Sequence, residues 1–210
     1  MDTSDVNSVI PALTPVQARV KRAFDISVAL LGLMFTWWLI LMAFVAASLD
    51  TRSNGFFVQR RVGKDGKVFQ VVKIKTMRPH NKTTTTVTCS GDPRITPLGR
   101  FFRKTKIDEL PQLWNVLLGQ MSFVGPRPDV PGYADQLTGV DRAILSLRPG
   151  ITGPATLKYR DEEELLATQD DPERYNREVI YPDKVKINLQ YIREWSFRGD
   201  LDCILATVLR

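Results

Sequence analysis

Two adjacent carboxylates, Asp108 and Glu109, stand just before a short apolar run that has helical spacing. We expect a helix here with Asp108 as its N-cap, Glu109 as its first residue, Pro111 in its first turn and Gly119 as its stop. The start of a helix is electrically positive, so it favours ionised acids and attracts phosphate. The pair could therefore serve phosphoryl chemistry. An ordinary helix start has the same pattern, so the interpretation depends on what accompanies the pair.

Four cationic side chains could bring a phosphorylated ligand to these acids. Lys73 and Lys75 are two residues apart in an expected strand and therefore share one face. Arg127 stands between two prolines, which fix the backbone and lower the entropy cost of presenting its guanidinium. Arg148 precedes a proline and a glycine in a similar arrangement. A solvated strand face would explain the two lysines equally well, and proline and glycine are ordinary loop residues.

The composition limits the chemistry and suggests the partners. The chain has 210 residues and a formal net charge of +6, which favours a polyanionic partner such as nucleic acid, anionic lipid or a nucleotide-like substrate. His80 is the only histidine, and Cys89 and Cys203 show neither zinc nor disulfide spacing. A catalytic triad that uses imidazole is therefore excluded. Catalysis would have to rest on carboxylates, lysines, arginines and a bound metal ion.

One segment, Ile26–Leu49, runs for 24 residues without a charge and is long enough as a helix to cross a bilayer core of roughly 30 Å. Basic residues flank it on both sides, in Arg19–Arg22 and in Arg52–Lys64, and both flanks favour the cytoplasmic side. A re-entrant helix, which enters the membrane and leaves on the same side, satisfies both flanks. Gly32 and Thr36 are the only residues near its middle that would ease the bend.

The rest of the chain predicts a hairpin and amphipathic helices. Two alternating segments, Phe56–Val62 and Val68–Lys75, surround an Asp65-Gly66 turn. Thr96 and Pro97 then begin a helix with one apolar and one cationic side, which suits either a membrane surface or a protein core. Residues 78–91 predict a mobile loop, and the acidic run at 161–164 predicts a solvated helix start.

These observations predict an α+β fold that is mainly helical. We expect a re-entrant membrane helix, a β-hairpin and interfacial amphipathic helices around a small globular domain. The corresponding boundaries are a flexible tail at 1–18, the re-entrant helix at 19–50 and a cytoplasmic, membrane-associated domain at 51–210.

The order of the motifs resembles that of a known family. The motifs are Lys21-Arg22-Ala23-Phe24-Asp25, Gln59-Arg60-Arg61-Val62-Gly63, Lys73-Ile74-Lys75-Thr76-Met77, Asp92-Pro93-Arg94-Ile95-Thr96, Asp108-Glu109-Leu110-Pro111-Gln112, Gly125-Pro126-Arg127-Pro128 and Arg148-Pro149-Gly150-Ile151-Thr152-Gly153. Together they resemble the bacterial sugar transferases, the monotopic phosphoglycosyl transferases, from about Lys21 to the C-terminus. The chain looks like the minimal catalytic form of that family, without extra N-terminal spans.

The resemblance implies a reaction and roles for the residues. A Mg²⁺-dependent phosphoglycosyl transferase would move a sugar-1-phosphate from a UDP-sugar to polyprenyl (undecaprenyl) phosphate at the cytoplasmic face of the bacterial inner membrane and release UMP. This would be the first membrane step of glycoconjugate synthesis, and 51–210 would be the catalytic domain. Asp108 would attack the phosphate and form a covalent aspartyl phosphosugar, and Glu109 would help to hold Mg²⁺. The substrate-binding cations would be Lys73, Lys75, Arg94, Arg127 and Arg148.

Two other functions are compatible with parts of the sequence, and the sequence differs from the family pattern at one place. The family commonly has a Ser-Pro pair that breaks the membrane helix, and Trp37-Trp38 stands at that place here. A non-catalytic module could instead bind anionic membrane lipids through its basic helices, with Asp108 and Glu109 as caps only. Nucleic-acid binding is disfavoured, because an uncharged run of this length does not fit it and the basic residues are dispersed among acids. A homodimer is left open by the sequence.

Overall fold

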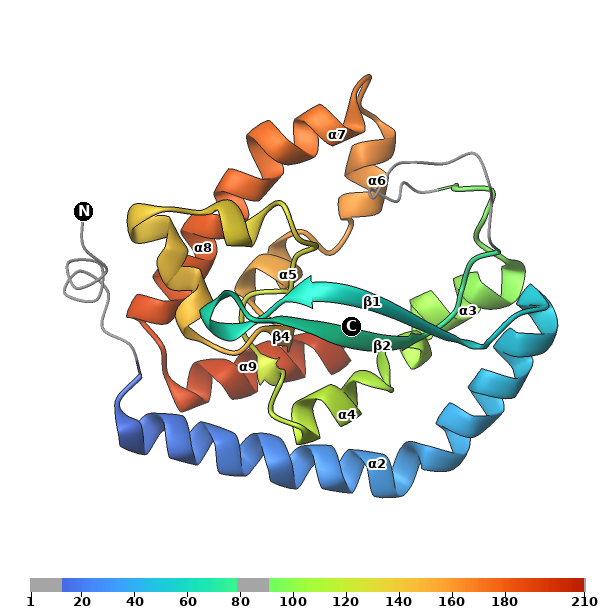
Figure 1. Cartoon of the computed structure of the whole chain (residues 1–210), viewed down its shortest axis with the longest axis horizontal. Coiled ribbons are helices and arrows are strands. Elements are labelled where there is room, and N and C mark those ends of the chain that lie inside the picture. Colours follow the sequence, from blue (N-terminus) through green and yellow to red (C-terminus); the bar gives the residue numbers. More distant parts are fainter. Residues whose placement is uncertain (1–12, 79–90, 210) are drawn as a thin grey trace.

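The computed structural model describes residues 13–78 and 91–209, and it is mainly helical with a β-hairpin, as the sequence predicts (Figure 1). Residues 1–12 of the predicted tail, His80, Cys89 and most of the predicted loop after Arg78 lie outside the described residues. The helices are α2 (Pro15–Thr51), α3 (Pro97–Thr105), α4 (Gln112–Leu117), α5 (Pro154–Lys158), α6 (Glu162–Ala167), α7 (Pro172–Tyr175), α8 (Tyr181–Arg193) and α9 (Phe197–Val208). The strands are β1 (Phe56–Val62), β2 (Val68–Ile74), β3 (Ser122–Val124) and β4 (Gly150–Thr152). Short turns of helix are η1 (Lys64–Gly66), η2 (Ile107–Glu109), η3 (Ala134–Gln136), η4 (Gly139–Ser146) and η5 (Asn176–Ile180).

Helix α2 begins at Pro15, so residues 15–18 are helical and do not belong to a tail as predicted. The reason is a capping box. The Thr14 hydroxyl accepts a hydrogen bond from the Gln17 amide at 3.3 Å, and the Gln17 side chain accepts one from the Thr14 amide at 2.8 Å. Figure 1 shows that α2 bends near its middle, where the Thr36 hydroxyl donates to the Gly32 carbonyl at 2.7 Å. Such back-bonding often bends helices.

Two stretches of α2, one in each half of the helix, bury a narrow stripe against the rest of the protein. Its buried residues recur mostly at intervals of four: Lys21, Asp25, Ala29, Ala43, Ala47 and Thr51. Among the described residues α2 is the one helix that is long and apolar enough to cross a membrane, and 11% of its most apolar 18-residue window is buried. Most of its apolar surface is therefore exposed.

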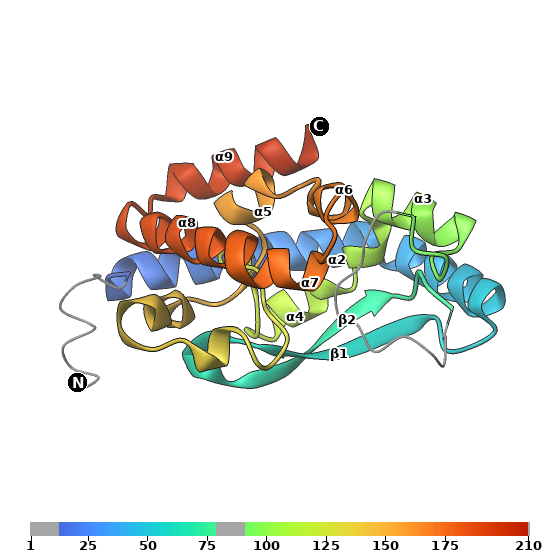
Figure 2. The ribbon, with the colours of Figure 1, turned by 90° about the horizontal axis from the view of Figure 1, so that it is seen from above.

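The hairpin forms as predicted. β1 and β2 pair antiparallel, with Val62 opposite Val68 and Arg61 opposite Phe69. Asp65 and Gly66 both have positive φ angles, 58° and 77°, which is the conformation that an Asp-Gly turn between paired strands requires. Figure 2 shows the hairpin on the side of the molecule opposite to α9.

The segment with the two carboxylates differs from the prediction. Asp108 and Glu109 lie in η2, a 3₁₀ turn, and α4 begins only at Gln112 with Pro111 as its N-cap. Asp108 is therefore not an N-cap, because Pro111 interrupts the segment and a separate turn precedes the helix. The predicted stop is confirmed: α4 ends at Leu117, and Gly119 has a positive φ of 79°.

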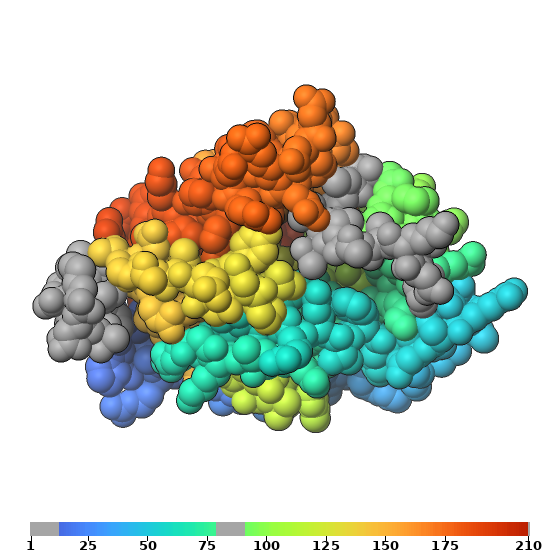
Figure 3. Space-filling model, turned by 45° about the horizontal axis from the view of Figure 1, so that its top comes forward, coloured from blue at the N-terminus to red at the C-terminus, as the bar shows by residue number. Residues whose placement is uncertain are grey.

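The C-terminal elements complete the core. β3 and β4 pair in parallel, and α8 packs with α9 and η4 around buried residues that include Val124, Leu145, Val185 and Ile192. The acidic run begins α6, as predicted. Figure 3 shows the segment after β3, coloured yellow, lying against the hairpin. The fold thus places η2, β2 and the loop after β3 next to one another.

Candidate active site

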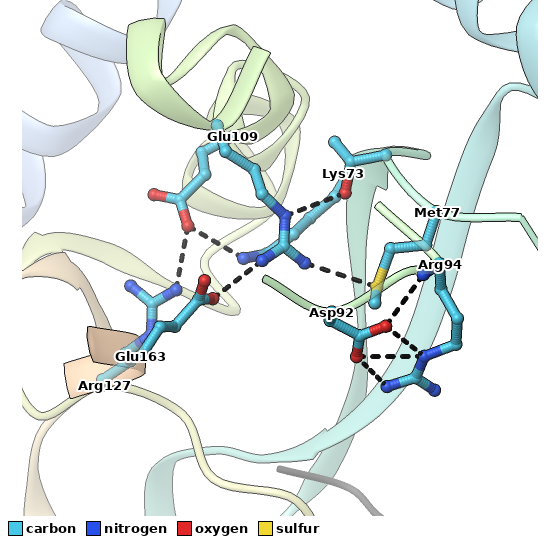
Figure 4. Close-up of polar contacts among 9 residues, drawn as sticks. Lys73, Met77, Asp92, Arg94, Glu109, Arg127 and Glu163 are labelled. Carbon is cyan, nitrogen blue, oxygen red and sulfur yellow. Dashed lines mark hydrogen bonds and ion pairs between the residues drawn. The ribbon is translucent and has the colours of Figure 1, made fainter. Parts of the chain in front are cut away.

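Glu109 lies at the centre of an ion-pair cluster (Figure 4). Its Oε1 atom accepts hydrogen bonds from Lys73 Nζ at 2.8 Å and from Arg127 Nη2 at 2.9 Å. Glu109 comes from η2, Lys73 from β2 and Arg127 from the loop after β3. Three of the residues that the sequence singles out are therefore brought together from distant parts of the chain.

The cluster keeps Glu109 ionised. Burial alone would raise the pKa of Glu109, but the charges of Arg127 and Lys73 outweigh burial and hold this pKa well below its usual range. The same carboxylate raises the pKa of Arg127. Burial lowers the pKa of Lys73, although Glu109 opposes that change. Glu109 is thus a fixed negative charge between two cations at physiological pH.

Asp108 is in a different electrostatic state from its neighbour. Asp108 is only 8% exposed, and its buried Oδ1 atom has no hydrogen-bond partner among the described residues. Burial, together with the negative charge of Glu109, raises the pKa of Asp108 to about 6. The group is mainly ionised at pH 7 and is not stabilised by a capping bond. A carboxylate of this kind is suited to act as a nucleophile toward a phosphoryl group whose charge is neutralised.

Backbone hydrogen bonds fix the loop that carries Arg127. The Gly125 amide donates to the Thr152 carbonyl at 3.0 Å, and the Gly150 amide donates to the Pro126 carbonyl at 2.8 Å. A Cβ atom on Gly150 would lie 2.2 Å from the Gly125 nitrogen. Glycine is therefore required where the two chain segments meet.

Arg61 belongs to the same site, although the sequence prediction does not include it among the site residues. Its Nη1 atom donates to the Pro128 carbonyl at 3.0 Å, and its Nη2 atom donates to Gln59 Oε1 at 2.6 Å. Burial and the neighbouring charge of Arg127 lower the pKa of Arg61 to about 10, and Glu109 opposes that change. Arg61 therefore both holds the Arg127 loop and adds positive charge to the site.

Asn115 is a second positioning residue that the sequence prediction does not include. Its side chain accepts a hydrogen bond from the Val72 amide at 3.2 Å and donates to the Gln70 carbonyl at 2.7 Å. These bonds join α4 to β2. Because η2 directly precedes α4, they also fix Glu109 relative to Lys73.

Two predicted cations have other partners. The Arg94 guanidinium binds the carboxylate of Asp92, with Nη2 to Oδ2 at 2.6 Å and Nε to Oδ1 at 2.9 Å. Lys75 Nζ donates to the Ser53 hydroxyl at 3.0 Å. Lys73 and Lys75 are thus directed to different partners, and the expectation that they hold one phosphate together is not met by these contacts.

Arg148 also lies away from the carboxylates. Its Nε atom donates to the carbonyl of Gly119 at 2.8 Å, after the C-terminal end of α4, whereas Asp108 and Glu109 precede the N-terminal end of that helix. The described contacts therefore do not bring Arg148 together with Arg127 at the carboxylates. The two Pro-rich loops lie side by side, because the Gly150 amide donates to the Pro126 carbonyl, but their arginine side chains have different partners, which local sequence does not report.

The side chains near the site show which groups could hold the predicted magnesium ion. Among residues 13–78 and 91–209, no group of three or more His, Cys, Asp and Glu side chains is arranged to hold a metal. An ion cage made of protein groups alone is thus not supported there. Mg²⁺ is commonly held by one or two carboxylates together with substrate phosphates and water. Glu109 and the unpartnered Oδ1 atom of Asp108 fit that mode.

The fold and the site together define a class of protein. One long apolar helix is joined to a small domain in which two cations bind one of two adjacent carboxylates, an arrangement suited to a phosphorylated substrate. Comparison with known families agrees with this class. The family model described as "Bacterial sugar transferase" matches residues 16–210. The chain therefore belongs to the bacterial sugar transferase family.

Several named relatives are similar over most of the chain. The galactosyl transferase CpsE of Streptococcus agalactiae is 35% identical over an alignment of 203 residues that covers 90% of this chain and 41% of CpsE. The UDP-glucose:undecaprenyl-phosphate glucose-1-phosphate transferase of Escherichia coli is 34% identical, over 94% of this chain and 41% of that protein. The exopolysaccharide production protein ExoY of Rhizobium meliloti is 30% identical, over 94% of this chain and 87% of ExoY. The chain thus covers about two fifths of the first two relatives and most of the third.

Proposed function

We propose that this protein transfers a sugar-1-phosphate from a UDP-sugar to polyprenyl phosphate and so begins the assembly of a bacterial polysaccharide or other glycoconjugate. The observation that carries the proposal is the pair of unequal carboxylates: Asp108 is buried without a capping bond, and Glu109 is ionised between Lys73 and Arg127. The name of the Escherichia coli relative, which specifies UDP-glucose and undecaprenyl phosphate, supports the same class of substrates.

The first step in the proposal is attack by Asp108. A carboxylate oxygen of Asp108 forms a bond to the phosphorus that carries the sugar, and the bond from that phosphorus to the bridging oxygen breaks, so that UMP leaves with the electron pair. Arg127, Lys73 and Arg61 supply positive charge near the transferring phosphoryl group. The products are UMP and a covalent aspartyl phosphosugar.

The second step regenerates the enzyme. An oxygen of polyprenyl phosphate attacks the same phosphorus, and the bond to Asp108 breaks, which returns the carboxylate. In the proposal Glu109, with substrate phosphate oxygens, holds Mg²⁺, which when bound neutralises phosphate charge. The two acids thus have separate roles, and their opposite pKa shifts are consistent with this division.

The proposal also includes a re-entrant α2. Both halves of the helix pack on the same domain. Near one end Asp25 accepts a hydrogen bond from the Phe123 amide at 3.1 Å, and near the other end Ala47 packs in a core with Ile74 and Phe102. A straight span would place these ends on opposite sides of a core roughly 30 Å thick, where one small domain could not contact both.

The exposed side chains supply a surface for lipid. Large apolar residues cover the outer faces of α2: Leu30, Leu31, Met34, Phe35, Trp37, Trp38, Leu41, Met42, Val45 and Leu49. Phe101 of α3 and Trp114 and Leu118 at α4 are also exposed. In the proposal these faces lie in the inner leaflet, and the basic flanks keep the catalytic domain on the cytoplasmic face of the inner membrane.

Two experiments test the proposal. Purified protein with Mg²⁺ and polyprenyl phosphate is assayed for UMP release across a panel of UDP-sugars, and we expect release with at least one sugar and none with Asp108→Asn. UMP release that is equal in the variant would contradict the role of Asp108. For topology, Ser8→Cys and Asn54→Cys are labelled in a background without Cys89 and Cys203. Labelling of both from the cytoplasmic side is expected, and labelling from opposite sides would establish a span.

A further inference from the structure

Arg103, in the last turn of α3, joins that helix to two other parts of the structure. Its Nε atom donates to the Thr76 hydroxyl at 3.1 Å, and its Nη2 atom donates to Met77 Sδ at 3.4 Å. Its Nη1 atom donates to Glu163 Oε1 at 2.7 Å, and Glu163 lies in the first turn of α6. Figure 4 shows Met77 and Glu163 among these contacts. Arg103 therefore connects α6 with the segment after β2.

The partners of Arg103 leave its charge to one carboxylate. A hydroxyl group is neutral, and a thioether sulfur is a weak acceptor. Among residues 13–78 and 91–209, Glu163 is the one acidic group that forms an ion pair with Arg103. By contrast, the Arg94 guanidinium is held by both carboxylate oxygens of Asp92. Arg103 is thus less firmly neutralised than Arg94, and Glu163 is its counter-ion.

Arg103 acts on the proposed nucleophile. The chain runs from Arg103 through Lys106, whose φ of 59° ends α3, directly into the η2 turn that contains Asp108. Burial and the charge of Glu109 raise the pKa of Asp108, and Arg103 is one of the cations that oppose this rise. A phosphate that Asp108 attacks would therefore lie within the field of Arg103.

Glu163 can leave Arg103 while α6 stays in place. Its side chain is 48% exposed, and an exposed ion pair contributes little to stability. Other residues hold the helix: Glu162 Oε2 accepts a hydrogen bond from Lys184 of α8 at 2.6 Å, and Leu166 is buried. A change of rotamer would carry the Glu163 carboxylate into solvent and free the Nη1 atom of Arg103.

We propose that Glu163 is an exchangeable counter-ion, which competes with the phosphate of the nucleotide for Arg103. The inference rests on the proposed function, in which UMP is released between the two steps. A guanidinium that loses its phosphate partner in a partly buried site is left with an unpaired charge, which is unfavourable. The Arg103 side chain is 25% exposed, and Glu163 supplies the replacement anion. Glu163 thus lowers the affinity for UMP and favours its release.

The test measures binding of UMP and does not use activity. The full chain in detergent micelles with Mg²⁺ is titrated with UMP in a calorimeter. Loss of the competing carboxylate in Glu163→Gln should lower the Kd of UMP by about threefold to fivefold, the upper range of what an exposed ion pair contributes. Glu164→Gln is the matched control, because Glu164 is adjacent, exposed and equally charged but forms no ion pair among the described residues. It should leave the Kd unchanged.

A second pair of variants tests whether the competition occurs at Arg103. In an Arg103→Gln background, Glu163→Gln should change the Kd of UMP by less than about twofold, because the ion pair that couples the two positions is already lost. An effect of the same size in both backgrounds would overturn the inference. If Arg103→Gln does not fold, the comparison of Glu163→Gln with Glu164→Gln decides the question alone.

The direction of the change in Kd separates the inference from other roles of Glu163. An unchanged Kd in Glu163→Gln, or an equal decrease in Glu164→Gln, would overturn it. Weaker binding of UMP by Glu163→Gln would also overturn it and would indicate that the ion pair holds α6 over the ligand. If the protein without substitutions binds no UMP, the proposed function is contradicted together with the inference, whereas the other outcomes leave that function in place.

Discussion

Replacement of the proposed nucleophile should stabilise the protein. Asp108 is 8% exposed, and its pKa is raised from 3.8 to about 6. A raised folded-state pKa means that ionisation opposes folding: the cost is absent below the unfolded pKa and fully present above the folded one. Two pKa units at about 1.36 kcal/mol each give a cost of about 3 kcal/mol at pH 7. Asp108→Asn removes this cost but leaves a buried amide that lacks partners, which costs about 1–3 kcal/mol, so we expect a net gain of up to about 2 kcal/mol.

The assay is thermal unfolding in detergent micelles at several pH values. A gain of this size should raise the midpoint by up to about 6 °C at pH 7. Because the gain follows the ionisation of Asp108, the charge contribution should fall by about half at pH 5 and nearly vanish at pH 4. A helix cap predicts the opposite sign, since loss of a capping carboxylate destabilises by about 1 kcal/mol. Destabilisation by Asp108→Asn at pH 7 would therefore refute the reasoning.

Glu109→Gln is the matched control at the adjacent position. Glu109 pairs with Lys73 and Arg127, so its loss leaves two cations without their counter-ion. Because Arg127 is 44% exposed, part of this cost is screened by solvent, and we expect a loss of about 2–3 kcal/mol. The two neighbouring substitutions should thus shift the unfolding midpoint in opposite directions.

Three further outcomes follow from the same site. kcat/KM for UDP-sugar should fall about tenfold per pH unit below about 6, since Asp108 must be ionised to attack; a break near pH 4 in the measured profile would contradict the raised pKa. Asn115→Ala should destabilise the fold by about 2–3 kcal/mol in thermal melts, because it leaves the Val72 amide and Gln70 carbonyl unpaired. Removal of divalent cations with EDTA should abolish UMP release, and added Mg²⁺ should restore it; full activity in EDTA would exclude the proposed metal.

The sequence predicts correctly those elements whose conformation is determined by residues adjacent in the chain. The Asp65-Gly66 pair marked the turn of the hairpin, and Thr96 with Pro97 marked the start of α3. In both places the chemistry of two or three adjacent residues requires one backbone conformation. The same kind of signal was present at Thr14 and Gln17, where a capping box begins α2 inside a polar segment that was interpreted as a tail.

The sequence does not predict which partners a loop side chain meets in the folded protein. Arg127 and Arg148 stand in similar Pro-rich sequences, yet one pairs with Glu109 and the other binds the carbonyl of Gly119. Nothing within either loop distinguishes them, because the difference arises from the elements that pack around each. The role of Asn115 is of the same kind, since it depends on the distance between α4 and β2.

The position of Arg61 in the site depends on the register of the hairpin strands. In an antiparallel pair, residues directly opposite one another have side chains on the same face. In the structure Arg61 lies opposite Phe69, which shares a face with Lys73 four residues later. A two-residue Asp65-Gly66 turn alone would instead place Arg61 opposite Gln70, on the other face from Lys73, so the turn signal does not identify Arg61 as a site residue.

The most direct test of the central claim is the mass of the protein after reaction with the donor alone. Intact protein with Mg²⁺ and a UDP-sugar that supports UMP release is quenched before polyprenyl phosphate is added, and its mass is measured. A covalent aspartyl intermediate predicts a mass increase equal to one sugar phosphate, located on the peptide that contains Asp108 and absent in Asp108→Asn. An unmodified mass accompanied by UMP release, or an adduct on another residue, would contradict Asp108 as the nucleophile.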